Sequence, residues 1–198
     1  MLYANFDQTA LIKFLAKQGF NLNRTTIFNY TRYGYITAPI KKPNATKGGR
    51  RICYHPFTCF EILTALLLFK GDFLIPDSEF RIPRFSGLDV FLARLNMYKL
   101  SNNLLSYQHI YLHCTDATEY FKDCYVGMDA LYIESFLSSK QDDLLCELIK
   151  QQNEGKVKDS YLTFIVDIYS VTFKYLYGKY IDELMAFIDE NEKFGGTH

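Results

Sequence analysis

Residues 24–36 read RTTIFNYTRYGYI, a short helical pattern with an unusually polar surface. Asn23 or Thr25 can cap a helix that runs to about Tyr33, and Gly34 can end it. Only one isoleucine and one phenylalanine in this helix are plainly apolar, while the other positions carry arginine, threonine, asparagine and tyrosine. A helix that only fills a core is more apolar than this, so the pattern predicts a helix with a functional polar face.

A second helical pattern precedes this stretch. Asp7 or Thr9 can cap it, Gly19 can end it, and apolar residues recur between them at helical spacing. The short segment FNLN separates the two patterns. Helix, tight turn and helix within the first 35 residues predict a helix-turn-helix arrangement.

The residues after this pair of helices, TAPIKKPNATKGGRRICYHP at 37–56, predict a basic hairpin. Prolines, an asparagine and two adjacent glycines supply turn chemistry. The flanking residues 40–42 and 50–54 have the length of two short strands. A third helix follows at 57–69, with apolar residues on most of its surface, and it is long enough to support the first two.

Residues 71–87 contain two prolines and two glycines, so they cannot form a continuous helix. We therefore expect a mainly α protein in two parts. An N-terminal winged helix-turn-helix domain at 1–73, with a small β-hairpin as its wing, is followed by a linker at 74–87 and an all-helical C-terminal domain at 88–198. The helices expected in the second domain span 88–111, 118–137, 139–153 and 160–192.

The charges of the two parts are opposite, although the 198-residue chain has 22 basic and 22 acidic residues. Residues 1–73 contain ten basic and three acidic residues, a net charge of +7, and residues 74–198 contain twelve and nineteen, a net charge of −7. A basic small domain joined to an acidic larger domain is typical of a nucleic-acid-binding protein with a separate sensing or assembly domain.

The polar helix and the hairpin together predict a binding site for double-stranded DNA. We expect residues 24–33 to enter the major groove and the wing at 40–54 to contact the phosphate backbone. Asn29 can bond a base edge, adenine by preference. The expected DNA-binding residues are Arg24, Thr25, Thr26, Asn29, Tyr30, Arg32, Lys41, Lys42, Lys47, Arg50, Arg51 and Tyr54.

The stretches TTIFNYTRYGYI and GGRRICYHPFTCFEI resemble the N-terminal domain of MerR-family transcription regulators, whose recognition helix is approximately T-I-R-Y-Y-E-R-x-G-L-I. The resemblance covers about residues 8–70 and implies a sequence-specific transcriptional regulator. It also implies that Tyr30, Arg32, Arg50 or Arg51, and Tyr54 contact the DNA backbone. The matching positions are Thr26, Ile27, Tyr30, Arg32, Gly34, Ile36, Pro39, Gly49, Tyr54, Glu61 and Ile62.

Three positions of the polar helix differ from the family pattern. Phe28 replaces an arginine, Asn29 a tyrosine and Thr31 a glutamate, so the family's base preference is not carried over. Pro76 and Pro83 lie where the family usually continues into a dimer-forming helix. Two alternatives stay open: an excisionase-like architectural DNA-binding protein, and a winged-helix module that binds another protein.

The C-terminal part offers candidates for assembly and sensing. The amphipathic helix at 160–192 is the best candidate for a homodimer interface. Many tyrosines and phenylalanines could line a site for an unidentified small-molecule effector, although such residues more often form a core. The possible metal ligands are His109 and His113, one helical turn apart, together with Cys114 and Cys124, whose thiols an amphipathic helix could equally bury.

Several functional classes are not expected from this sequence. We find no phosphate-binding loop, dinucleotide fingerprint or hydrolase motif, and we expect neither an enzyme nor a bound cofactor. No apolar run is long enough to span a membrane, and the first residues do not resemble a signal peptide. Five irregularly spaced cysteines indicate free thiols, so we expect a cytoplasmic protein.

Overall fold

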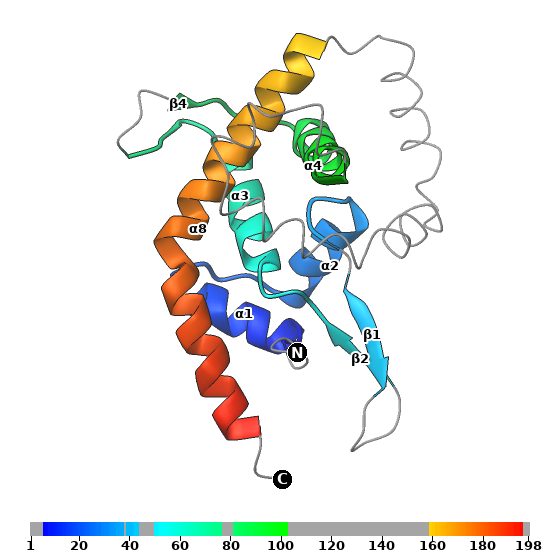
Figure 1. The fold of residues 1–198 in the computed structure, drawn as a ribbon, viewed down its shortest axis with the longest axis vertical. Helices are drawn as coiled ribbons and strands as arrows, with labels where there is room; N and C mark the ends of the chain where they lie inside the picture. The colour runs from blue at the N-terminus through cyan, green and yellow to red at the C-terminus, as the bar shows by residue number, and fades with distance from the viewer. Residues whose placement is uncertain (1–5, 38, 44–49, 77–80, 103–158, 196–198) are drawn as a thin grey trace.

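The computed structural model describes residues 6–37, 39–43, 50–76, 81–102 and 159–195. These residues form a mainly helical structure with two small antiparallel strand pairs, as expected for the fold class (Figure 1). The elements are α1 (Gln8–Lys17), α2 (Arg24–Arg32), β1 (Ile40–Pro43), β2 (Arg50–Cys53), α3 (Thr58–Lys70), β3 (Phe73–Leu74), β4 (Arg81–Ile82), α4 (Gly87–Asn102) and α8 (Asp159–Gly195).

Helices α1 and α2 begin with the same capping chemistry. The Asp7 carboxylate accepts a hydrogen bond from the backbone N–H of Ala10 at 2.9 Å, and the Asn23 side chain accepts one from Thr26 at 2.8 Å. Each cap satisfies a backbone donor that has no partner inside the helix. Of the two cap candidates for each helix, the structure therefore selects Asp7 and Asn23.

The two helices also end in the same way. Gly19 and Gly34 adopt positive φ angles of 87° and 71°. The next residue then donates its N–H back into the last turn, from Phe20 to the Leu15 carbonyl and from Tyr35 to the Tyr30 carbonyl, both at 2.9 Å. This is the Schellman motif, which needs a residue that tolerates positive φ, and it confirms both predicted helix ends.

Strands β1 and β2 form the predicted hairpin, with Lys41 opposite Ile52 in the antiparallel register. The chain before α1 attaches to the base of this hairpin. The N–H of Tyr54 donates to the Phe6 carbonyl at 2.8 Å, and Asp7 forms a β-bridge with Cys53. The hairpin is therefore anchored to the start of α1.

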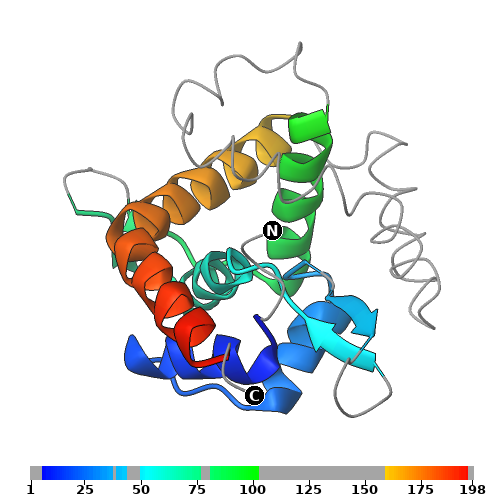
Figure 2. The same ribbon diagram turned by 60° about the horizontal axis from the view of Figure 1, so that its bottom comes forward.

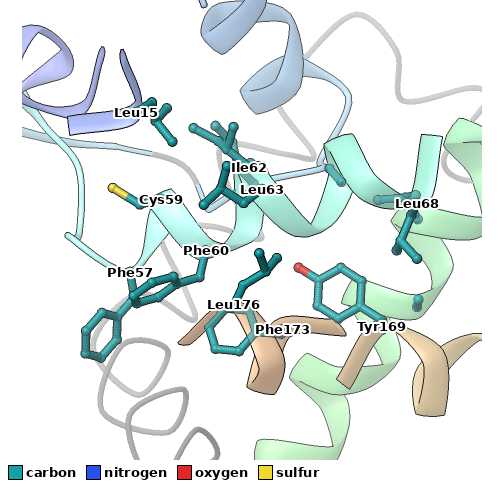
Figure 3. Close-up of a cluster of buried hydrophobic side chains, with 14 of the residues drawn as sticks. Leu15, Phe57, Cys59, Phe60, Ile62, Leu63, Leu68, Tyr169, Phe173 and Leu176 are labelled. Carbon is teal, nitrogen blue, oxygen red and sulfur yellow. The ribbon is translucent and has the colours of Figure 1, made fainter. Parts of the chain in front are cut away.

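Helix α3 lies at the centre of the core, with α1, α4 and α8 around it (Figures 1 and 2). Nearly all of its residues from Thr58 to Leu68 are buried, as its apolar sequence predicts. Figure 3 shows its contact with α8, where the rings of Phe60 and Phe173 meet edge to face with centroids 5.7 Å apart. Burial of this many large side chains is the main stabilising term of the fold.

The apolar stripe of α8 packs within the chain. Helix α8 contacts α3 and α4, and Phe187 near its end contacts Phe14 of α1 and Phe6, with ring centroids 5.6 and 6.4 Å apart. The stripe that suggested a dimer interface is thus covered by the chain's own core, and a homodimer stays a prediction. The stripe residues Ile165, Tyr169, Phe173, Leu176, Leu184 and Phe187 are buried, at the spacing the sequence predicts.

The segment expected as a linker contributes to the same core. Strands β3 and β4 pair within it, and Ile75, Ile82 and Phe85 are buried. The N–H of Phe85 also donates to the Leu68 carbonyl at 2.9 Å, near the end of α3. Described residues before and after this segment therefore share one buried cluster, and the division into two domains stays a prediction.

Helix α4 begins with a capping box, in which Ser86 and Asp89 exchange hydrogen bonds. The hydroxyl of Tyr161, near the start of α8, donates to the same Asp89 carboxylate, and this joins the first turns of the two helices. The predicted helices at 118–137 and 139–153 lie outside the described residues. No helix in the described part of the chain is long and apolar enough to cross a membrane.

Candidate nucleic-acid interface

Helix α2 and the hairpin lie next to each other on one side of α3 (Figures 1 and 2). The middle of α8 and the β3–β4 pair lie on the other side, in both views. Ile27 anchors α2 and is fully buried, while the opposite surface of the helix is open. The polar face that the sequence predicts for residues 24–33 is therefore exposed beside the hairpin.

The exposed face of α2 carries Arg24, Thr25, Phe28 and Arg32. The guanidinium carbon of Arg32 lies 6.0 Å from the ring centroid of Tyr33, a cation–π arrangement that restricts the arginine while its donors stay open to solvent. Of the other expected contacts on α2, Asn29 and Tyr30 are only half-exposed. The Thr26 hydroxyl bonds the Asn23 cap at 3.0 Å, so this threonine supports the helix start.

Three aromatic rings pack together at the C-terminal end of α2. Tyr30 packs against Tyr35 and Phe69, with ring centroids 5.6 and 5.9 Å apart. Burial, with a smaller contribution from the neighbouring tyrosine in each case, raises the pKa of Tyr30 and of Tyr35. Both phenols therefore remain protonated at neutral pH, when they can donate a hydrogen bond.

The two adjacent arginines of β2 have different roles. Arg50 is exposed, as is Lys41 on the neighbouring strand. Arg51 instead donates to the Asp7 carboxylate at 2.9 Å, and so ties the hairpin to the cap of α1. Burial acts to raise the pKa of Asp7, but the bonds from Ala10 and Arg51 outweigh it, and this pKa lies below its ordinary value.

The structure does not show the other three expected DNA-binding residues of the hairpin segment, Lys42, Lys47 and Tyr54, as exposed. Tyr54 is only 5% exposed. Burial raises the pKa of its phenol, and a hydrogen bond with the Thr31 side chain partly opposes that rise. Tyr54 is thus mostly buried beside Thr31 of α2, and its contact with the DNA backbone stays a prediction. Lys42 and Lys47 lie outside the described side chains.

A buried ion pair fixes the corner between α2 and β1. Arg94 of α4 donates from Nε to Glu61 Oε1 of α3 at 3.1 Å, and the two side chains are 2% and 4% exposed. Glu61 also accepts from the backbone N–H of Thr37 at 2.6 Å and from its hydroxyl at 2.8 Å. Arg94 further donates to the Gly34 carbonyl at 3.2 Å and to the Thr37 hydroxyl at 2.7 Å.

This network gives the buried Glu61 of α3 a structural role. Glu61 and Arg94 together bind both ends of the segment 34–37, which directs the chain from the last turn of α2 into the hairpin. The sequence contains a weak signal for such a pair, because one arginine interrupts the apolar run VFLARL and one glutamate interrupts the run FEIL. Which charges meet depends on the packing of α4 on α3, and local patterns do not contain that information.

The segment that contains α2 and the hairpin is strongly basic. Residues 1–73 contain only three carboxylates, Asp7, Glu61 and Asp72. Each of them forms an ion pair with an arginine: Arg51, Arg94 and Arg81 respectively. The exposed cations of α2 and the hairpin therefore lack an acidic residue of this segment to neutralise them, and their field favours a polyanion.

Within the described parts of the chain, no group of three or more His, Cys, Asp or Glu side chains is placed to bind a metal ion. The candidate ligands His109, His113, Cys114 and Cys124 lie outside those parts. The described cysteines, Cys53 and Cys59, are buried, and burial raises the pKa of the Cys59 thiol well above its ordinary value. No protein-family model, curated protein or solved structure matches this chain.

Proposed function

We propose that this protein binds double-stranded DNA, with α2 in the major groove and the β1–β2 hairpin on the adjacent phosphates. The observation that carries the proposal is the set of exposed cations on these two elements, in a segment, residues 1–73, whose three carboxylates each form an ion pair. Such a surface supports binding through release of the counterions that surround DNA. The exposed cations are Arg24, Arg32, Lys41 and Arg50.

The dimensions of α2 fit this role. Nine residues at about 1.5 Å each give a helix of roughly 14 Å, comparable with the width of the major groove, about 12 Å. In this proposal the hairpin beside it acts as the wing of a winged helix-turn-helix domain. The order of elements agrees with the MerR-like pattern in the sequence, which supports a role in transcription regulation.

The rest of the chain has a supporting role in this proposal. Helix α4 supplies Arg94, which fixes the corner between α2 and the hairpin, and α8 covers α3 from the far side. We further propose that residues beyond α4 form the dimer interface or bind an effector, as for regulators of the resembled family. The protein would then act in the cytoplasm.

The test is binding of the full chain to a random-sequence DNA duplex across a series of salt concentrations. Each cation that neutralises one phosphate contributes about 0.9 to the slope of log affinity against log salt. We expect Arg32→Ala and Arg50→Ala each to weaken binding and to lower the slope by about 1. Arg81→Ala is the matched control, because it removes the same charge from β4, on the other side of α3.

The competing proposal is a protein-binding module, and it rests on exposed apolar side chains of the same surface. Phe28, Tyr33 and Ile52 are 61%, 42% and 47% exposed. If the wild type fails to bind DNA at low salt, the DNA-binding proposal is wrong and these residues indicate a protein partner. If all three arginine variants lose affinity equally, the binding is non-specific attraction to net charge and the assigned interface is wrong.

A further inference from the structure

Among the large apolar side chains that the structure describes, Phe28 is the most exposed, at 61%. It lies in the middle of α2, one turn after Arg24 and one turn before Arg32. Residues at this spacing share one ridge of a helix. The ridge presents one apolar ring between two positive charges, and it is therefore suited to a partner that offers both an apolar group and negative charge.

The packing of α2 shows that Phe28 is not needed for the core. The neighbouring Ile27 is fully buried and anchors the helix, and the edge of α2 near α3 is filled by Tyr30 against Phe69. Thr31, one turn after Ile27, donates its hydroxyl to the Ile27 carbonyl at 3.0 Å. Phe28 lies about 100° around the helix from Ile27 and projects into solvent on the same ridge as Arg24 and Arg32.

We propose that Phe28 contacts the 5-methyl group of a thymine in the major groove and so determines base specificity. The proposal rests on the DNA-binding function above and adds a base preference to it. Thymine is the one standard base that presents an apolar group in the major groove, and phenylalanine is one of the side chains that contact it. The flanking Arg24 and Arg32 would bind phosphates or guanine edges on either side of that base pair.

A bulky apolar ring also disfavours other bases at that position. Cytosine and adenine present amino donors there, and guanine presents two acceptors, which a phenylalanine cannot satisfy. A base edge that loses its water without a new hydrogen bond weakens binding. Selection among the four base pairs would thus combine attraction to the methyl group with rejection of the polar alternatives.

The experiment begins with selection of preferred duplexes by the full-length wild type from a random pool. In the best site, each thymine is replaced in turn by deoxyuridine, which removes only the methyl group and keeps the hydrogen-bonding edge. We expect one or two positions at which this change weakens binding about three- to tenfold, the size expected for one buried methyl group. Placing 5-methylcytosine at such a position restores the methyl group without thymine's acceptor, and should weaken binding less than cytosine does.

The variant Phe28→Ala identifies the side chain responsible. It should bind the thymine and deoxyuridine sites equally, and its salt slope should equal that of the wild type because no charge is lost. Leu74→Ala is the matched control, since it truncates another exposed apolar side chain, 53% exposed on β3, and should leave the methyl preference intact. Both residues are exposed, so neither variant is expected to unfold the protein.

The outcomes separate this inference from the proposed function. A wild type that binds DNA with a steep salt slope but ignores deoxyuridine at every position overturns the thymine contact and leaves DNA binding intact. A methyl preference that persists in Phe28→Ala also overturns it, because another side chain then makes the contact. A wild type that selects no DNA overturns both proposals, and the exposed ring then belongs to a protein interface.

Discussion

The ion pair between Glu61 and Arg94 offers the sharpest test of the packing. Replacing Arg94 with methionine keeps much of the side-chain volume but leaves the Glu61 carboxylate buried without its charge partner. Both side chains are almost fully buried, at 4% and 2% exposure, so solvent cannot compensate. Breaking a buried pair in this way costs about 3–5 kcal/mol, a large part of the 5–15 kcal/mol by which domains are usually stable.

The double variant Glu61→Gln/Arg94→Met completes a thermodynamic cycle. Each single variant leaves one buried charge uncompensated, whereas the double variant removes both charges. We therefore expect the double variant to cost less than the sum of the two singles, with a coupling of at least about 2 kcal/mol. Arg81→Met is the control, because its ion pair with Asp72 is more than two-thirds exposed and is worth about 0–1 kcal/mol.

Urea unfolding followed by far-ultraviolet circular dichroism measures each free energy. Amide hydrogen exchange adds a local readout, because the N–H of Thr37 donates to Glu61 at 2.6 Å and should exchange faster in Arg94→Met. The reasoning is refuted if Arg94→Met costs no more than Arg81→Met, or if the two single variants are additive. Either result would mean that α4 does not bury this pair against α3.

Three further predictions concern the backbone and the titrating side chains. Gly71→Ala should lower the free energy of unfolding by about 1–3 kcal/mol more than Gly19→Ala does. Both glycines have positive φ angles, but only a Cβ at Gly71 would meet the Arg84 backbone, at 2.6 Å. Chemical unfolding measures the difference, and equal costs would contradict the prediction. The folded pKa of Asp7 lies below its ordinary value of 3.8, so the stability it contributes is present above that pH and is lost as the pH falls through the folded pKa. Asp7→Asn should remove this acid-dependent part in unfolding curves, and an unchanged pH profile would contradict it. Burial, together with the hydrogen bond to Asp89, raises the pKa of Tyr161 from 10.0 to about 12. The stability that this phenol contributes should therefore be complete below pH 10 and be lost as the pH rises toward about 12. Tyr161→Phe should remove this loss from the alkaline part of the curve of stability against pH. A wild-type curve that is already flat in this range would refute the prediction.

The local features of the fold are largely predictable from the sequence. Caps at Asp7 and Asn23 and ends at Gly19 and Gly34 follow from side-chain and backbone chemistry within a few residues of each helix end. The hairpin follows from its turn residues in the same way. Such interactions do not depend on the rest of the fold, and the sequence pattern therefore locates them.

The contacts between distant segments are not predictable in this way. Arg50 and Arg51 are adjacent and chemically identical, yet only the second meets Asp7, because the base of the hairpin pairs with the start of α1. The apolar stripe of α8 is visible in the sequence, but a stripe does not indicate whether it packs on its own chain or on another. Arg94 likewise needs the packing of α4 on α3 to find Glu61.

The contact of Phe187 with Phe6 and Phe14 has a consequence for how the protein matures during synthesis. The first helix is synthesised long before the helix that covers its apolar side, so the core that supports the proposed DNA-binding surface is completed only after α8 has been translated. Messages with premature stop codons before α8 should therefore yield aggregation-prone fragments that are removed by proteolysis. They should not yield short DNA-binding products that compete with the intact protein for its sites.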